Sequence, residues 1–160
     1  MSFKDEYIAW SDDLSVGLQE IDEQHKVLTN LINRLFNEAI MHKADRSVIS
    51  GILNELVQYT IVHFAVEESL FRIFDYPGIE PHQKEHEQLK QKVVDFQKSF
   101  EDGNPIDVEL MGFLRKWLKD HIMISDKRYT NFFLEKGFKP HWAKQQSWVG
   151  KVWNSISRTR

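Results

Sequence analysis

The chain has 160 residues, with 7 glycines, 4 prolines, 7 histidines and no cysteine, and a formal net charge of −3. This length suits one domain with a single core, and the lack of cysteine excludes disulfides, thiolate metal sites and cysteine nucleophiles. The small negative charge argues against nucleic acid as the main partner, and any metal ion would have to be bound by His, Asp or Glu.

The sequence shows no targeting or membrane signal. Its first residues are polar and lack the apolar core of a secretory signal. A run of about 18 apolar residues, the minimum for a membrane-spanning helix, does not occur. We therefore expect a cytoplasmic protein without a transmembrane segment.

An N-terminal arm, residues 1–18, precedes the first predicted helix. It contains five large apolar side chains that are too hydrophobic to remain in water, namely Tyr7, Trp10, Leu14, Val16 and Leu18. We expect this arm to pack across the rest of the domain.

Four long segments with helical periodicity follow the arm, separated by short breaks. The first covers about residues 19–42, and the second follows a break at 43–47 and ends near residue 74. The third covers about 81–100 and the fourth about 107–134. Asp45 is the predicted N-cap of the second helix, and Gly137 is the predicted stop after the fourth. The pattern predicts an all-α fold, an antiparallel up-down-up-down four-helix bundle over residues 19–136.

A basic, tryptophan-rich extension, residues 137–160, follows the bundle and contains Trp142, Trp148 and Trp153. The chain from Lys127 onward carries a charge of +7, whereas the first 126 residues carry −10. The extension is compatible with a short fifth helix on the acidic bundle, with a protein-partner or dimer contact, or with a peripheral membrane contact. Gly150 weakens any continuous helix there.

The histidines are the most informative residues of the predicted bundle. Each helix has a seam of core-facing residues spaced by threes and fours, and five histidines lie on these seams: His25, His63, His82, His86 and His121. A single seam histidine is usually a hydrogen-bonded core residue. Five unpaired buried imidazoles would each cost about 1–3 kcal/mol, so they need a shared partner. The antiparallel topology brings all five to one level of the core.

Two acidic residues accompany these histidines. Glu67 follows His63 by four residues and shares its helical face. Asp126 follows His121 by five, which rotates it about 140° on an ideal helix, so its side chain must reach in obliquely or the helix must be distorted. Two ions bridged by both carboxylates would use all seven groups, and this donor set suits iron better than zinc, copper or manganese.

The combined pattern resembles the hemerythrins, and specifically the bacterial members of that family. The matching segments are WSDDLSVGLQEIDEQHKVLTNLIN, HFAVEESLF, YPGIEPHQKEH and HIMISD, which together cover about residues 10–134. The resemblance implies a hemerythrin-like bundle with a non-haem di-iron centre that binds O2 reversibly for storage, delivery or sensing. It implies an oxygen-binding protein rather than an enzyme.

The resemblance also implies a role for each site residue. His82, His86 and His121 would bind one iron, and His25 and His63 would bind the other, which keeps an open position for O2. Glu67 and Asp126 would bridge the two irons together with an oxo or hydroxo group. An apolar wall is expected to restrict water and protons, with contributions from Leu28, Ile32, Leu70, Trp117, Ile122 and Ile124.

Other functional interpretations remain open at this point. One is a di-iron oxidoreductase that acts on peroxide or nitric oxide, and another is an interaction module that responds to oxygen or iron. The segment from His82 to His86 also matches the HxxEH pattern of some zinc proteases, but we expect Glu85 to face away from the seam that the two histidines share. His42 and His141 lie off the seams and are expected to be solvated.

Overall fold

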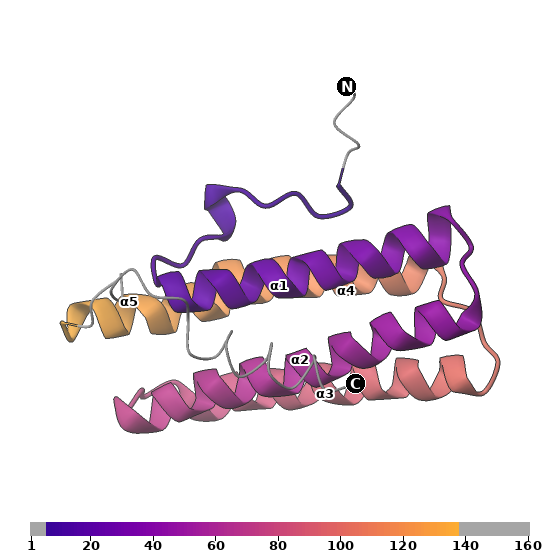
Figure 1. Cartoon of the computed structure of the whole chain (residues 1–160). Coiled ribbons are helices and arrows are strands. Elements are labelled where there is room, and N and C mark those ends of the chain that lie inside the picture. The colour runs from indigo at the N-terminus through magenta and orange to yellow at the C-terminus, as the bar shows by residue number, and fades with distance from the viewer. Residues whose placement is uncertain (1–5, 138–160) are drawn as a thin grey trace, which may run out of the picture.

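The computed structural model describes residues 6–137, which form four helical rods and, within that range, no strand (Figure 1). Three rods are the helices α1 (Gln19–Phe36), α2 (Arg46–Ile73) and α3 (Ile79–Glu101). The fourth consists of α4 (Val108–Asp120) and α5 (Lys127–Glu135), joined by the helical turn η3 (His121–Asp126). A short turn, η1 (Asp12–Leu14), precedes the bundle, and η2 (Asn37–Met41) extends α1. The predicted all-α four-helix bundle is confirmed.

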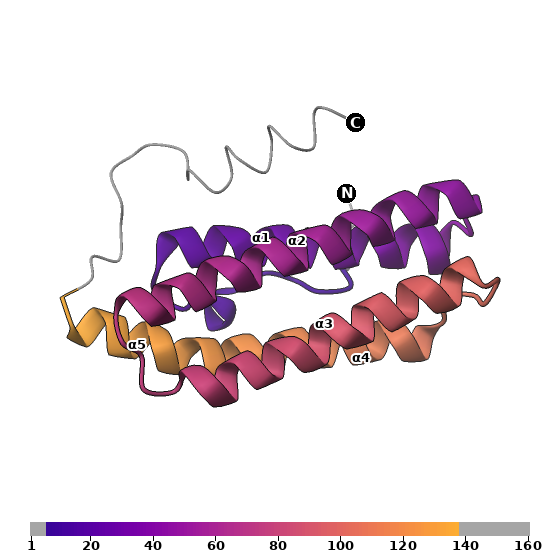
Figure 2. The same ribbon diagram turned by 90° about the horizontal axis from the view of Figure 1, so that it is seen from below.

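Successive rods run in opposite directions and occupy the four corners of the bundle (Figures 1 and 2). Helix α1 packs beside α2 and α4, and α2 packs beside α3. One end of the bundle therefore gathers the start of α1, the end of α2, the start of α3 and all of α5.

The helix ends follow local sequence signals. The side chain of Asp107 caps α4 by accepting a hydrogen bond from the backbone N–H of Leu110 at 2.8 Å. Asp45 occupies the predicted N-cap position of α2, although its side chain makes no capping hydrogen bond. Gly137 follows α5 with a φ of +87°, a conformation that favours glycine, so the predicted stop is confirmed. Helix α3 begins before the predicted start because Pro81 lies in its first turn, where a missing N–H costs nothing.

The N-terminal arm lies along the bundle. Leu14, Val16 and Leu18 are buried in the core. The carboxylate of Asp22 on α1 accepts hydrogen bonds from the Ser15 hydroxyl at 2.6 Å and from the backbone N–H of Val16 at 2.8 Å. These bonds connect the arm to the first turn of α1, one turn from the polar cluster of the core.

Two further sequence expectations concern a transmembrane segment and the C-terminal extension. Across the part of the chain that the structure describes, no helix combines the length and the apolarity needed to cross a membrane. The expected fifth helix and the tryptophans of the 137–160 extension lie beyond Gly137, outside the described residues.

Candidate metal centre

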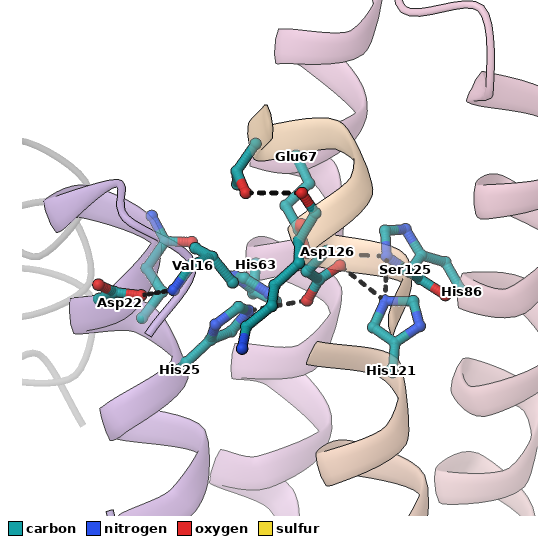
Figure 3. Close-up of polar contacts among 12 residues, drawn as sticks. Val16, Asp22, His25, His63, Glu67, His86, His121, Ser125 and Asp126 are labelled. Carbon is teal, nitrogen blue, oxygen red and sulfur yellow. Dashed lines mark hydrogen bonds and ion pairs between the residues drawn. The ribbon is translucent and has the colours of Figure 1, made fainter. Parts of the chain in front are cut away.

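Seven buried polar side chains, contributed by all four rods, converge at one level of the core. Figure 3 shows how His25, His63, Glu67, His86, His121 and Asp126 lie in this cluster. They form two sets, and within each set the potential ligand atoms all lie within 4.8 Å of one another. One set contains Glu67, His82, His86, His121 and Asp126, and the other contains His25, His63, Glu67 and Asp126. Because both sets share the same two carboxylates, these lie between a group of three histidines and a group of two.

Aromatic side chains fix the orientation of the histidines on α3. The ring of Phe64 stacks on His86, with centroids 3.7 Å apart, and Phe71 contacts the edge of His82 at 4.7 Å. On the neighbouring rod, Trp117 stacks on His121 with centroids 4.4 Å apart. The imidazoles therefore point inward because their flat faces pack against apolar rings.

Asp126 enters the core through a local distortion of the fourth rod. Residues His121–Asp126 form a π-helical turn, in which the backbone bonds from i to i+5 rather than from i to i+4. The wider turn brings a residue five positions later onto the inward side. Asp126 is 0% exposed, and its Oδ1 lies 3.1 Å from His121 Nε2. Of the two possibilities that the spacing left open, an oblique side chain or a distorted helix, the structure shows the distorted helix.

Several central atoms lie at short distances from one another without hydrogen-bond geometry. His25 Nε2 lies 3.0 Å from Asp126 Oδ2, and His82 Nε2 lies 3.0 Å from Asp126 Oδ1. These atoms and both carboxylate oxygens of Glu67 have no hydrogen-bond partner among the described residues. Buried polar atoms are costly when unpaired, whereas ligands aimed at a shared cation are satisfied by it. The donor set and its orphaned atoms therefore fit bound metal ions.

At four groups of this centre burial opposes the charged form, and at three of them the charges of neighbouring groups outweigh it. His121 holds the pKa of Asp126 well below its usual value, and His63 and His86 lower the pKa of Glu67. Asp126 and Glu85 in turn raise the pKa of His121 to about 10. Burial prevails at His86 and lowers its pKa to about 3. The carboxylates of this centre therefore favour positive charge beside them, which the protonated His121 supplies here and which bound metal ions would supply in its place.

Two side chains outside the ligand sets orient histidines through hydrogen bonds, and neither was predicted from the sequence. The amide oxygen of Gln24 lies 2.7 Å from His63 Nδ1, and the Glu85 carboxylate lies 2.8 Å from His121 Nδ1. Glu85 belongs to neither ligand set and flanks the seam that the two histidines of α3 share, but its side chain reaches across to the fourth rod. Gln24 and Glu85 each directly precede a seam histidine, which is the signal that could have identified them.

A small cavity of about 20 Å³ adjoins the histidines and has room for a single molecule the size of water. Leu28, Ile32 and Trp117 line it, as expected for the apolar wall. Ile124 is 58% exposed, so its predicted place in the wall is wrong, because the π-helical turn rotates it outward. Two further wall predictions, Leu70 and Ile122, are half-buried and fully buried respectively, and neither lines the cavity.

The two histidines off the seams have different outcomes. His42 is exposed, as expected, and its Nδ1 lies 3.1 Å from Glu38 Oε1. His141 lies outside the described residues. Among those residues, the two sets that share Glu67 and Asp126 are the groups of three or more His, Asp or Glu able to bind an ion.

Comparisons with known proteins agree with this geometry. Residues 16–132 match the model of a hemerythrin HHE cation binding domain. A bacteriohemerythrin of Pseudomonas paraeruginosa is 37% identical over 125 residues, which cover 78% of this chain and 80% of the relative. A bacteriohemerythrin of Clostridium acetobutylicum is 31% identical over 128 residues, covering 76% of this chain and 98% of the relative. A crystal structure of wild-type hemerythrin, 29% identical, superposes with a TM-score of 0.74 and covers 78% of this chain and 96% of that one.

Proposed function

This chain belongs to the hemerythrin family, and on that premise we propose that it binds O2 reversibly at a non-haem di-iron centre. One observation supports the proposal most strongly. Seven buried side chains fall into two overlapping ligand sets that share Glu67 and Asp126. A site for a single ion would not need two sets, and a purely structural core would not orphan so many polar atoms.

We assign the ligands from the membership of the two sets. His82, His86 and His121 would hold one iron, and His25 and His63 would hold the other. Glu67 and Asp126 would bridge the pair with an oxo or hydroxo group. Since the second set has one histidine fewer, its iron would keep a coordination position open for O2.

The donor set favours carriage of O2 over its consumption. When bound, the di-iron pair would supply the electrons that O2 takes up on binding and returns on release. Five neutral imidazoles and two carboxylates carry less negative charge than the glutamate-rich sites of ferritin-like di-iron proteins. A site with less anionic charge stabilises high-valent iron less well, so the proposal is storage, delivery or sensing of O2.

Apart from the proposed ligands themselves, the lining of the adjoining cavity is mostly apolar. Leu28, Ile32 and Phe64 line the adjoining cavity. Its one hydroxyl, from Thr60, already donates a hydrogen bond of 2.7 Å to the backbone carbonyl of Leu56. The bound gas would therefore meet few groups able to protonate it, which favours its release intact.

Optical spectroscopy of the iron-loaded protein tests this proposal. We expect a coloured form in O2 that returns to a nearly colourless form under argon, over repeated cycles. A lack of reversible colour change would contradict it. Rapid conversion to a stable diferric form with catalytic loss of peroxide or nitric oxide would instead indicate an oxidoreductase.

A further inference from the structure

The HxxEH segment contains a carboxylate whose position the ligand assignment does not explain. Glu85 is not a member of either ligand set, yet its Oε2 lies 2.8 Å from Nδ1 of His121. The Ser125 hydroxyl donates a second hydrogen bond, of 2.6 Å, to the same oxygen. Ser125 can do so because the π-helical turn presents it and Asp126 together to the interior.

This contact settles which nitrogen of His121 faces the centre. Nε2 lies 3.1 Å from Asp126 Oδ1 and 3.2 Å from His86 Nε2, so it is the inward nitrogen. Nδ1 donates its proton to Glu85, which leaves the Nε2 lone pair directed at the metal position.

Three of the other histidines, His25, His63 and His86, have weaker outer contacts. Nδ1 of His63 faces the neutral amide oxygen of Gln24 at 2.7 Å. Nδ1 of His25 and Nδ1 of His86 have no hydrogen-bond partner among the described residues, and the nearest carboxylate to His86, that of Glu68, is 3.5 Å away. A hydrogen bond to a charged acceptor is roughly twice as strong as one to a neutral acceptor. The two metal positions are therefore supported unequally.

We propose that Glu85 is a positioning residue for the metal centre. Its carboxylate holds His121 in one tautomer and makes it a stronger electron donor than His25, His63 or His86, which favours the oxidised state of the three-histidine metal. The inference rests on the proposed di-iron function.

Three variants test the inference. Glu85→Ala removes the acceptor and its charge, whereas Glu85→Gln keeps an acceptor oxygen and removes only the charge. Glu87→Gln is the matched control: it removes the same charge two residues along α3, at a side chain that is 67% exposed and contacts Lys90. Circular dichroism of the metal-free proteins establishes that each variant folds, and Glu85→Gln carries the test if Glu85→Ala does not fold.

The readouts are Fe2+ affinity under anaerobic conditions and the midpoint potential of the loaded centre. We expect an affinity loss of about 10- to 100-fold for Glu85→Ala, the range found for partners of metal-bound histidines, and a smaller loss for Glu85→Gln. The midpoint potential should shift to more positive values in both and stay unchanged in Glu87→Gln. If both Glu85 variants match Glu87→Gln while the parent binds two irons, the inference alone is overturned. If the parent binds no iron, the proposed function is overturned, and this inference with it.

Discussion

At the scale of single residues, the two shared carboxylates differ in kind from the histidines around them. Glu67 and Asp126 are fully buried, neighbouring histidines lower the pKa of each, and each belongs to both ligand sets. A buried carboxylate that loses its cation remains as an uncompensated charge, whereas a neutral imidazole does not. Loss of a shared carboxylate should therefore affect two ions, and loss of a histidine only one.

Replacement of one ligand of each kind tests this difference. We expect His82→Ala to lower bound iron from two per chain to one, because only the three-histidine position loses a ligand. Glu67→Gln should weaken the binding of both ions. Iron analysis after anaerobic loading measures the outcome, with His42→Ala, at an exposed histidine, as the control that keeps both. Two tightly bound irons in His82→Ala would show that the ligand assignment is wrong.

The sequence predicts which residues come together at the candidate metal centre. It predicts less well which neighbouring side chains orient those residues. The seam histidines and Glu67 could be found because each lies at a spacing of three or four from other core residues, a property of one helix alone. Gln24 and Glu85 flank the seams, and their partners are 39 and 36 residues away on neighbouring helices. Such contacts depend on how far apart and how rotated two helices are, which periodicity does not specify.

At the scale of elements, the π-helical turn η3 determines which side chains of the fourth rod face the core. An uninterrupted α-helix would place Ile124 on the core seam with Leu114 and His121. In the turn, Ile124 is instead 58% exposed, while Ile122 and Asp126 are both 0% exposed. The sequence indicated a distortion here only through the five-residue spacing of His121 and Asp126, and it did not indicate which apolar residue would leave the core.

Alanine substitutions at Ile122 and Ile124 test which of the two side chains the turn places in the core. We expect Ile122→Ala to lower the free energy of unfolding by about 2–5 kcal/mol, because it leaves a cavity in a packed core. Ile124→Ala should change it by less than about 0.5 kcal/mol, since the side chain is mostly in water. Urea unfolding of the metal-free variants gives both values. A larger loss at Ile124 than at Ile122 would mean that the rod is α-helical through this region.

At the scale of the whole molecule, the polar cluster connects all four rods near one end of an otherwise apolar core. The core includes Leu35, Leu53 and Met111, each at most 2% exposed, along with further buried aliphatic side chains. This apolar part needs no ion to hold it together, so the bundle has the means to fold without metal. The polar end does need a bound ion, because several of its buried carboxylate and imidazole atoms have no hydrogen-bond partner among the described residues.

Metal removal should therefore destabilise the protein without abolishing its fold. We expect a chelated sample to keep its helical circular dichroism and to unfold at a lower temperature than the loaded one. An ion present at a hundredfold excess over its dissociation constant adds about 2.7 kcal/mol to the free energy of unfolding. Thermal unfolding with and without chelator measures the difference. Identical unfolding temperatures would indicate that the cluster is satisfied without metal.

The arrangement of helices was predictable from the sequence because length, breaks and seams are properties of each segment. The course of the N-terminal arm was not, since it depends on contacts such as that of Asp22 with Val16.

The central claim is that seven side chains form one site for two ions. Anaerobic titration of the metal-free protein with Fe2+, followed by removal of loosely bound metal and iron analysis, tests it most directly. We predict a break at two irons per chain. A break at one iron, or no tightly bound iron, would contradict the claim.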